Sequence, residues 1–519
     1  MSEDSVYDFG GLKFRVLFSK WGYAPHYAEH VIDPLDGKPK LVMADPHIRY
    51  IRHSVYIYRH SVYIYGVHIY GHRVYIYDPV KKEIEWEFKV PGQLSNPHIA
   101  HMVTDQNPIT GPFWSLVADK IKASPGDIVC ADGDNNLIVI DRERKNVKHV
   151  LKIPDSKWLH DIIPSVNGDG LIIDDYSRGW VRKIDFNAKT IWELNFEKIC
   201  EVKLSENSTI KLQPCKASPC KMSTVYAKAS KHEESYGGDY IVVNNSNPHG
   251  VYEISDEGEL LWSCPSNPPC MNATWLYHPH SAFRTGLAEF RSNLTVIGLE
   301  GGGGIIAVDR ECRPRWGFMK PHFNVVKVGN AERRLYRPSF HGFFQTTHVF
   351  PLLNGNIGAI DWRGKYSSQV VEIISFPSKT ALYWLLAWYY PVSTNGVVFK
   401  PIEIGEWDII AVQVVNNGQY ALEYELLVST LPQIYPEPKD SKQIPQEKLS
   451  ILRQIYPQKY NFALKTIDKN NTIHKNNQVK PGETDLYVID RNIYSVLLVK
   501  ARAIEQETRV TIYITQKRY

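Results

Sequence analysis

The sequence predicts an all-β protein, built as a six-bladed β-propeller followed by a C-terminal immunoglobulin-like β-sandwich. Three features predict this class: many aromatic residues, frequent turn residues, and one strand-rich module that recurs six times. The 519 residues include 31 Tyr, 13 Trp and 18 Phe, together with 33 Gly and 32 Pro. Aromatic side chains favour pleated, half-buried surfaces, and Gly and Pro supply turns between short strands. Extended helical periodicity is hard to find.

Composition excludes several classes of protein. Hydrophobic residues make up 43% and charged residues 22%, as in ordinary globular proteins. A net charge of only +4 gives no electrostatic argument for nucleic acid, and we expect none as a partner. The longest apolar run, Ala381–Val392, is about half of the roughly 20 residues of a spanning helix, so we expect no transmembrane segment.

Residues 1–44 contain one clear strand-like run, LKFRVLF, and could close the propeller ring. The following stretch, Arg49–Asp78, repeats the unit RHSVYIY. Alternate residues of a strand face opposite sides, so each VYIY places Val and Ile on one face and two Tyr on the other. A local duplication and a continuous strand pair would both produce this pattern.

The recurring module predicts the propeller, which we expect over residues 45–398. Each copy reads Gly-Asp or Gly-Asn, an apolar strand, a polar turn, a strand ending in Ile-Asp, a charged turn and a third strand. The six copies start at Gly66, Gly126, Gly168, Gly238, Ser292 and Gly355. A further strand before each copy would complete a four-stranded blade.

A Trp in the third strand marks most copies. The second strand ends at Asp78, Asp141, Asp185, Ser255, Asp309 and Ser375. Seven to nine residues later stand Trp86, Val150, Trp192, Trp262, Trp316 and Trp384, so five of the six copies have Trp. We expect these indoles to fill the space between blades.

Residues 399–519 continue as strands without this signature, which predicts the sandwich. Within them, residues 431–458 are rich in Pro and charge and are predicted to be an inserted loop.

The cysteines and sequons favour an extracellular surface or a virion. Cys215 and Cys220, and Cys264 and Cys270, lie in two Pro-containing loops, and we expect each pair to form a local disulfide. Pairing between the two loops is the alternative. The spacing is not the C-x₂-C of zinc sites, and disulfides imply an oxidising compartment or a hyperthermophile. Asn-x-Ser/Thr sequons, candidate glycosylation sites, occur at Asn207, Asn244, Asn272, Asn293 and Asn470.

Histidines cluster where the innermost strand of four blades is expected. They are His98, His101, His160, His278, His280, His341 and His348. Imidazoles that converge on the axis could bind a metal, bind an anion when protonated, or act as nucleophile and acid or base. They could equally bond to neighbouring backbone and line an inactive channel.

Three segments resemble the arylsulfotransferase propellers, which are of the PQQ/NHL type: WLHDIIPSVNGDGLIIDD, WLYHPHSAFRT and QTTHVFPLLNGNIGAIDWRG. That family has six blades and transfers sulfuryl groups between phenols through a central histidine, without a nucleotide cofactor. The resemblance implies that His348 is the nucleophile. It also matches His278 to the first His of a W-x-H-x-N-S pattern, and His160 to an earlier H-D position.

The catalytic set implied by this resemblance is incomplete. His280 stands where the family has Asn, and Val349 where it usually has an acidic residue. Glu300 and a run of glycines replace an Arg that would stabilise negative charge on a sulfuryl group. Gly302 and Gly303 in that run could cradle an anion with backbone N–H groups or form a plain turn. We count them, with His98 and His280, as candidate ligand-binding residues.

The predicted function is therefore a binding or assembly protein at a cell or virion surface, with protein or glycan partners. Assembly through the C-terminal sandwich, including homo-oligomers, is compatible with this hypothesis. The alternative is an active aryl sulfotransferase that uses His348, His278 and His160, which we expect to face one another across the axis. We expect no cofactor and no bound metal. The N-terminus lacks a basic-then-apolar signal pattern, so a cytoplasmic location also stays open.

Overall fold

The structure is a computed structural model of the chain. It describes residues 3–517 apart from residues 5, 10–11, 21, 47–48, 51–55, 59–60, 64–68, 71, 90–96, 105–113, 132–134, 158, 177, 196–200, 206–207, 212–221, 228–239, 246–249, 265–275, 277, 286–293, 301–303, 320–323, 329–330, 336–344, 363–367, 376–380, 400–401, 404–407, 430–471 and 491–495.

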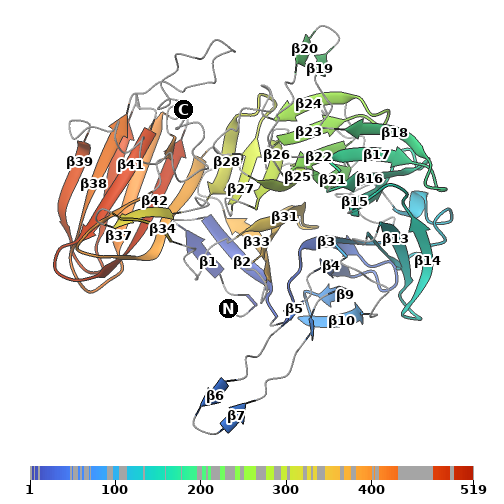
Figure 1. Cartoon of the computed structure of the whole chain (residues 1–519), viewed down its shortest axis with the longest axis horizontal. Coiled ribbons are helices and arrows are strands. Elements are labelled where there is room, and N and C mark those ends of the chain that lie inside the picture. Colours follow the sequence, from blue (N-terminus) through green and yellow to red (C-terminus); the bar gives the residue numbers. More distant parts are fainter. Residues whose placement is uncertain are drawn as a thin grey trace.

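Six antiparallel sheets stand around a common axis (Figure 1), which confirms the all-β, six-bladed propeller. From the axis outward, blade 1 consists of β3 (Tyr27–Ile32), β4 (Pro39–Asp45), β9 (Arg73–Asp78) and β10 (Glu83–Phe88). Blade 2 consists of β11 (Ile99–Met102), β12 (Ile128–Ala131), β13 (Asn136–Asp141) and β14 (Asn146–Lys152). Blade 3 consists of β15 (Leu159–Pro164), β16 (Leu171–Asp175), β17 (Trp180–Ile184) and β18 (Thr190–Asn195). Blade 4 is β21 (Met222–Ala227), β22 (Tyr240–Asn244), β23 (Gly250–Ile254) and β24 (Leu260–Cys264); blade 5 is β25 (Pro279–Thr285), β26 (Leu294–Leu299), β27 (Gly304–Val308) and β28 (Pro314–Met319); blade 6 is β31 (Thr346–Pro351), β32 (Ile357–Trp362) and β33 (Ser368–Ser375), completed by β2 (Leu12–Phe18) and β1 (Val6–Phe9). The six inner strands contact one another in ring order.

The N-terminal strands complete the last blade. β2 pairs antiparallel with β33, from Lys13 opposite Ser375 to Phe18 opposite Val370. The Arg15 guanidinium donates through Nε to Glu372, 2.9 Å away. Blade 1 in turn begins at β3, so the boundary expected between residues 44 and 45 falls inside β4.

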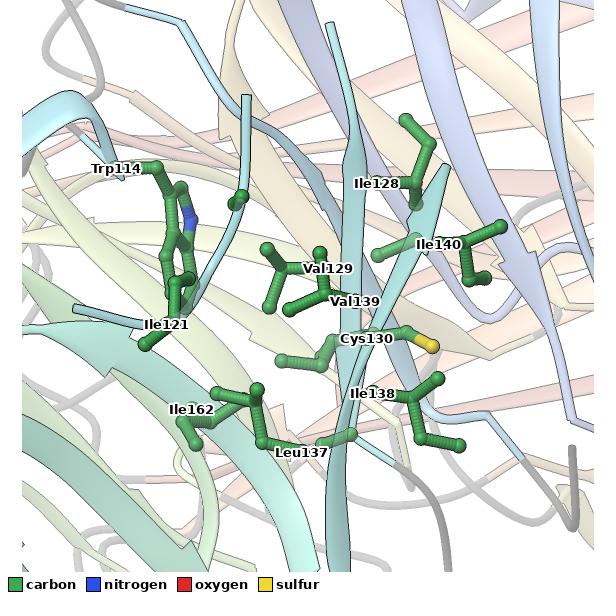
Figure 2. Packing of buried hydrophobic residues seen from close by; sticks show 14 of the residues in the cluster. Trp114, Ile121, Ile128, Val129, Cys130, Leu137, Ile138, Val139, Ile140 and Ile162 are labelled. Carbon is green, nitrogen blue, oxygen red and sulfur yellow. The ribbon is translucent and has the colours of Figure 1, made fainter. Parts of the chain in front are cut away.

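Buried aliphatic side chains fill the spaces between blades. All four residues of β12 are buried, so this strand packs on both faces. Figure 2 shows Val129 and Val139 of blade 2 beside Ile162 of blade 3, with Trp114 and Ile121 from the short segment before β12. Fully burying one such aliphatic side chain contributes about 1.5–3 kcal/mol.

The Trp of the repeat bonds to the next blade. In β10, β18 and β24, the indole Nε1 of Trp86, Trp192 and Trp262 donates to the carbonyls of Arg142, Asp256 and Arg310, at 2.9, 2.8 and 2.6 Å. Each acceptor follows the Asp or Ser that ends the third strand of the neighbouring blade. The Asp or Ser side chain accepts a backbone hydrogen bond within the turn that follows it. In blade 5, for example, Asp309 Oδ1 accepts the Arg313 N–H at 2.8 Å.

Gly258 shows why this turn restricts its sequence. It has φ +86°, and a Cβ there would lie 2.8 Å from the Trp192 ring. A side chain at Gly258 would therefore meet both an unfavourable backbone conformation and the indole of blade 3.

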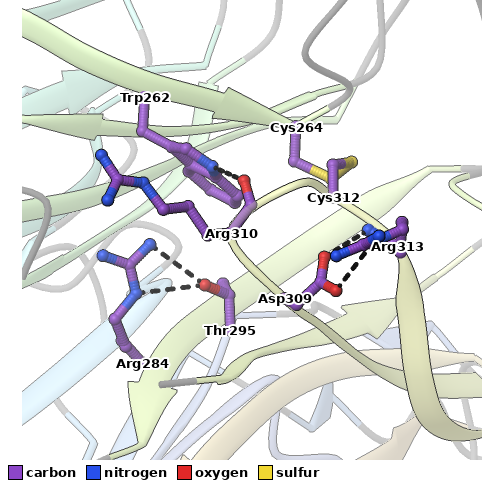
Figure 3. Close-up of a disulfide and its surroundings, with 8 residues drawn as sticks. All are labelled: Trp262, Cys264, Arg284, Thr295, Asp309, Arg310, Cys312 and Arg313. Atoms are coloured by element: carbon purple, nitrogen blue, oxygen red, sulfur yellow. Dashed lines mark hydrogen bonds and ion pairs between the residues drawn. A yellow bond between two sulfur atoms is a disulfide. The ribbon is translucent and has the colours of Figure 1, made fainter. Parts of the chain in front are cut away.

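A disulfide reinforces the same contact between blades 4 and 5. Cys264, at the end of β24, bonds to Cys312 in the turn after Asp309, with 5.2 Å between the Cα atoms (Figure 3). The expected partner of Cys264 was Cys270, so that pairing is corrected: the bridge joins two blades instead of closing one loop. Trp262 brings the two backbones together two residues earlier. Cys200, Cys215, Cys220 and Cys270 lie outside the described residues, and Cys130 is buried.

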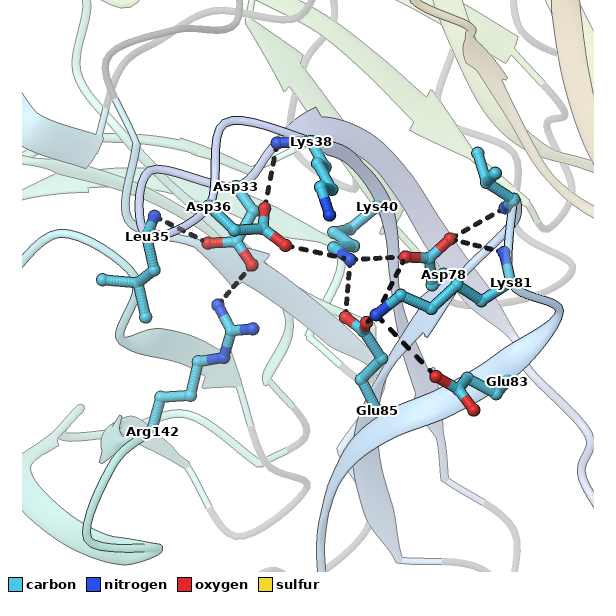
Figure 4. A network of polar contacts seen from close by, with 11 residues as sticks. Asp33, Leu35, Asp36, Lys38, Lys40, Asp78, Lys81, Glu83, Glu85 and Arg142 are labelled. Carbon is cyan, nitrogen blue, oxygen red and sulfur yellow. Dashed lines mark hydrogen bonds and ion pairs between the residues drawn. The ribbon is translucent and has the colours of Figure 1, made fainter.

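Blade 1 contains a fully buried lysine at its outer half. The Lys40 ammonium lies 2.7 Å from Asp78, 2.6 Å from Glu85 and 3.2 Å from Asp36 (Figure 4). Burial opposes the charge on Lys40, but these three carboxylates raise its pKa. Although burial would raise the pKa of Asp78, the Lys40 bond and two turn N–H groups lower it to about 2. Removing Lys40 would leave the buried Asp78 carboxylate without its nearest cation, which is costly.

The C-terminal domain is the expected β-sandwich. One sheet has the order β34 (Ala381–Val392), β42 (Thr508–Lys517), β37 (Ile409–Asn416), β40 (Thr484–Asp490); the other has β35 (Val397–Val398) and β36 (Ile402–Glu403) on one side of β41 (Val496–Ala503), followed by β38 (Leu422–Ser429) and β39 (Thr472–Val479). If β35 and β36 are taken as one interrupted edge strand, this is the order of the jelly-roll type of sandwich. The immunoglobulin-like order expected from the sequence is corrected on this point. The loop expected at 431–458 lies outside the described residues.

The sandwich and blade 5 share a sheet. β34 runs parallel to β28, with Gly317 opposite Leu382, and joins the two into eight strands. The sixth sequence copy was expected to end in this strand, with Trp384; β2 takes that outer position in blade 6 instead. Tyr513 of β42 packs against the core of blades 5 and 6.

The insertions between strands form hairpins. The Tyr-rich repeat after β4 supplies two strand pairs, β5 (Arg49–Tyr50) with β8 (Ile69–Tyr70) and β6 (Tyr56–Tyr58) with β7 (Ser61–Tyr63). The β6–β7 hairpin extends away from the ring (Figure 1). Two more hairpins are β19 (Glu201–Ser205) with β20 (Ser208–Lys211) and β29 (Asn324–Val328) with β30 (Ala331–Leu335). Within the described residues, no helix has the length and apolarity needed to span a membrane.

We expect Trp262→Ala to lower the free energy of unfolding by about 3–5 kcal/mol, because it removes a buried indole and its bond to blade 5. Val150→Ala is the control, since Val150 lies on the outer strand of blade 2 and is 48% exposed; it should change stability by less than about 0.5 kcal/mol. Guanidinium titration followed by circular dichroism measures both. Similar losses for the two variants would contradict the role assigned to the Trp.

Candidate functional site

The inner strands of blades 3 to 6 carry a register shift of the β-bulge type near their start. In β15 the pairing skips from Leu159 to Asp161, so His160 lies at the register shift. β25 skips His280 in the same way, and β31 skips Thr347. A bulge twists a strand locally and redirects a side chain, here toward the axis.

Blades 1 and 2 place histidines at the same position. The His26 N–H donates to the carbonyl of Ala44, 2.9 Å away, while Tyr27 also pairs with Ala44. In the same way, the His98 N–H donates to the carbonyl of Ala131, 3.3 Å away. Four of the six blades therefore present a histidine at this position: His26, His98, His160 and His280, from blades 1, 2, 3 and 5.

These four imidazoles form one buried cluster, which we call the axial histidine layer. The ring centroids of His98 and His160 are 4.6 Å apart, and those of His26 and His280 are 4.7 Å apart. His160 lies 5.8 Å from His26 and 5.4 Å from His280. Their exposed fractions are between 3% and 8%. Burial lowers the pKa of His280 against the opposing effect of Glu300, and its ring bonds to the Thr347 backbone.

A second, deeper group surrounds His101. Its Nδ1 lies 2.7 Å from Glu29 Oε2 and 3.2 Å from the Tyr27 hydroxyl, and its Nε2 lies 3.9 Å from Asp161. Burial would lower the pKa of His101, but Glu29 and Asp161 together raise it to about 9. His101 is therefore an imidazolium fixed between two carboxylates at neutral pH.

The buried carboxyl of Asp174 lies beside this group. One of its oxygens accepts the Asp161 N–H at 2.5 Å. Burial, and next the charge of Asp161, raise the pKa of Asp174 well above its ordinary value. The pair resembles other buried carboxylates that cannot both ionise.

His348 lies one residue beyond the bulge of blade 6 and faces different neighbours. Its ring packs on Tyr27 with centroids 4.3 Å apart and stacks on Phe350 at 5.6 Å. Burial, with the charges of His280 and His101, lowers its pKa well below the ordinary value. Among the described residues, its Nε2 is buried without a hydrogen-bond partner.

The described contacts bring His160, His98 and His280 together, with His26 as a member that sequence analysis missed. His278 stands two residues before the bulge, at φ 47°, and its carbonyl accepts the Glu300 N–H at 2.8 Å. Gly302, Gly303 and His341 lie outside the described residues. A sequence signal for His26 exists: the axial histidine follows a proline in blades 1, 2 and 5, as Pro25-His26, Pro97-His98 and Pro279-His280.

Of the five sequon asparagines, Asn244 lies within the residues that the structure describes. Asn244 ends β22 and is fully buried, which does not suit a glycan acceptor in the folded protein. The other four, Asn207, Asn272, Asn293 and Asn470, lie outside the described residues.

No protein-family model matches this sequence, and no curated protein matches it. Among the solved structures that align with it are two crystal structures of BBS1N in complex with ARL6DN. The mercury-soaked structure has 12% identity and a TM-score of 0.33, covering 72% of this chain and 98% of that chain. The lead-soaked structure has 11% identity and a TM-score of 0.32, covering 70% and 97%. The propeller assignment rests on the strand pairing above.

The His101 group should make stability depend on pH. Its folded pKa, about 9, exceeds the ordinary value near 6.5. The stabilisation is therefore complete below about pH 6.5 and is lost as pH rises through about 9. This difference in pKa contributes on the order of 3 kcal/mol to the free energy of unfolding. The melting temperature should fall across this range, and the fall should be absent in His101→Gln.

The control is His149→Gln, on the outer strand of blade 2. Its melting temperature should fall with pH as steeply as that of the unmodified protein. A His101→Gln profile with that same slope would show that the imidazolium is not responsible.

Proposed function

We propose that this chain is a non-enzymatic binding and assembly protein of a cell or virion surface, in which the propeller carries the sandwich as its contact module. The observation that carries the proposal is the continuous sheet from blade 5 through β34 into the sandwich. Backbone pairing, with Tyr513 packed on the propeller core, holds the sandwich in a fixed orientation. A fixed orientation lowers the entropic cost of assembling many copies.

The edge strand β40 is the surface we propose for assembly. Among the described strands it pairs on one side only, with β37. Leu486 and Val488 point away from the core and are 60% and 49% exposed. Natural edge strands usually avoid exposed apolar residues because a second strand can add to them. A second copy of this chain, paired through β40, would cover both side chains.

The axial site supports a binding role over sulfuryl transfer. A sulfuryl transition state needs cationic donors directed at its oxygens. The imidazolium of His101 is already bonded to Glu29, and Glu300 adds negative charge near His280. The disulfide between Cys264 and Cys312 is in keeping with a surface location or a hyperthermophile.

We expect the protein to self-associate through β40, and Leu486→Glu combined with Val488→Glu to weaken association more than tenfold, about 1.4 kcal/mol. Placing carboxylates in an apolar contact is costly. Sedimentation velocity over a range of protein concentrations measures this. Val150→Glu, on the outer strand of blade 2, is the control and should associate normally. A protein that stays monomeric throughout, or a double variant that associates as well as the control, would refute assembly through β40.

Sulfuryl transfer through His348 remains the second candidate, because its buried Nε2 has no hydrogen-bond partner among the described residues. A neutral imidazole can act as a nucleophile. We expect no turnover of p-nitrophenyl sulfate with a phenol acceptor. Turnover that disappears in His348→Ala and persists in His149→Ala would establish the enzyme and reject the non-enzymatic proposal.

A further inference from the structure

Three members of the axial histidine layer lie close enough to share one ion. One nitrogen each from His26, His98 and His160 falls within 4.8 Å of the other two. We infer that these three imidazoles bind a late first-row divalent cation, for which Zn²⁺ is the probe. The sequence alone led us to expect no bound metal, and His26 was not among the histidines that it singled out.

The geometry fits a metal site after a small adjustment. Zinc–imidazole bonds of about 2.0–2.1 Å in a tetrahedral site place the nitrogens roughly 3.4 Å apart. The rings stand on three different blades, so modest side-chain rotations toward the axis can close the remaining distance. Three protein nitrogens leave a fourth position for water.

The ligand type decides which ions are suitable. The three side chains are 8%, 4% and 3% exposed, and imidazole nitrogen suits Zn²⁺, Cu²⁺ and Ni²⁺. Mg²⁺ and Ca²⁺ prefer oxygen ligands. The inference therefore predicts selectivity for the first group of ions.

The surroundings of the trio add ring packing and a negative charge. Tyr176 stacks on His160 with ring centroids 5.5 Å apart. His280 is held by its bond to the Thr347 backbone and closes the layer next to His26. Glu300, fixed by Asn245 at 3.0 Å, supplies a nearby negative charge that acts on both His280 and Tyr176. Outer groups of this kind orient ligands and balance the charge of the ion.

A bound ion would connect blades 1, 2 and 3 at the axis. His26 directly follows the segment that contains the ring-closing strand β2. Binding free energy at such a site adds to the stability of the folded chain. This site is independent of β40 and of the assembly we propose for it.

Zinc binding by the full chain, first treated with a chelator and dialysed, tests the inference. Isothermal titration with Zn²⁺ should give one equivalent per chain, and the melting temperature should rise with Zn²⁺ and not with Mg²⁺. Co²⁺ should give the visible absorption of a tetrahedral nitrogen site.

His98→Gln and His160→Gln should each weaken Zn²⁺ affinity by more than the roughly 10–100-fold that accompanies loss of an outer-shell partner. His149→Gln, on the outer strand of blade 2, should bind as the unmodified protein does. Near-ultraviolet circular dichroism identifies the folded variants. No zinc binding by the folded unmodified protein, or full affinity in both ligand variants, would overturn the inference. Normal self-association in these variants would separate this result from the proposal for β40.

Discussion

The sheets of this propeller are apolar on both faces, so no blade can be stable without a neighbour on each side. β12, β16 and β22 are buried at every residue, and the main apolar clusters lie between blades. A row of such sheets would leave two unprotected faces at its ends. Closing the row into a ring removes both. The pairing of β2 with β33 is therefore a condition for the other five blades and for the axial site.

The blades could be predicted from the sequence because their signals are local. The Ile-Asp turn works through its own side chain, as Asp309 shows, and the Trp in the strand after that turn reaches a carbonyl in the adjacent blade. The sixth blade was only partly predictable. Its outer strand comes from the other end of the chain, and pairing between distant strands leaves no periodic trace. The same limitation explains Cys264, whose partner Cys312 lies in the next blade rather than the nearest loop.

The sequence indicated where along the chain the axial histidines lie, but not which of them meet. The innermost strands do lie where the histidine-containing segments predicted them, yet a one-residue bulge decides which imidazoles meet. His280 lies at the bulge, while His278 precedes it and His348 lies just beyond the bulge of its own blade. Alternation along an ideal strand cannot reveal a bulge, because the extra residue reverses the facing of the residues after it. His26 was missed since its blade begins in residues that carry no copy of the repeat.

The closing strand also has a consequence for biosynthesis. Arg15 and its partner Glu372 are 357 residues apart, which at about 5–20 residues per second corresponds to roughly 20–70 s on the ribosome. Phe14, Val16 and Phe18 are fully buried in the finished ring, but during that interval their final partners do not yet exist. The hairpin of β1 and β2 can form at once and pair one edge of the strand. Its apolar side chains must wait, which makes the nascent chain a natural client for chaperones until blade 6 emerges.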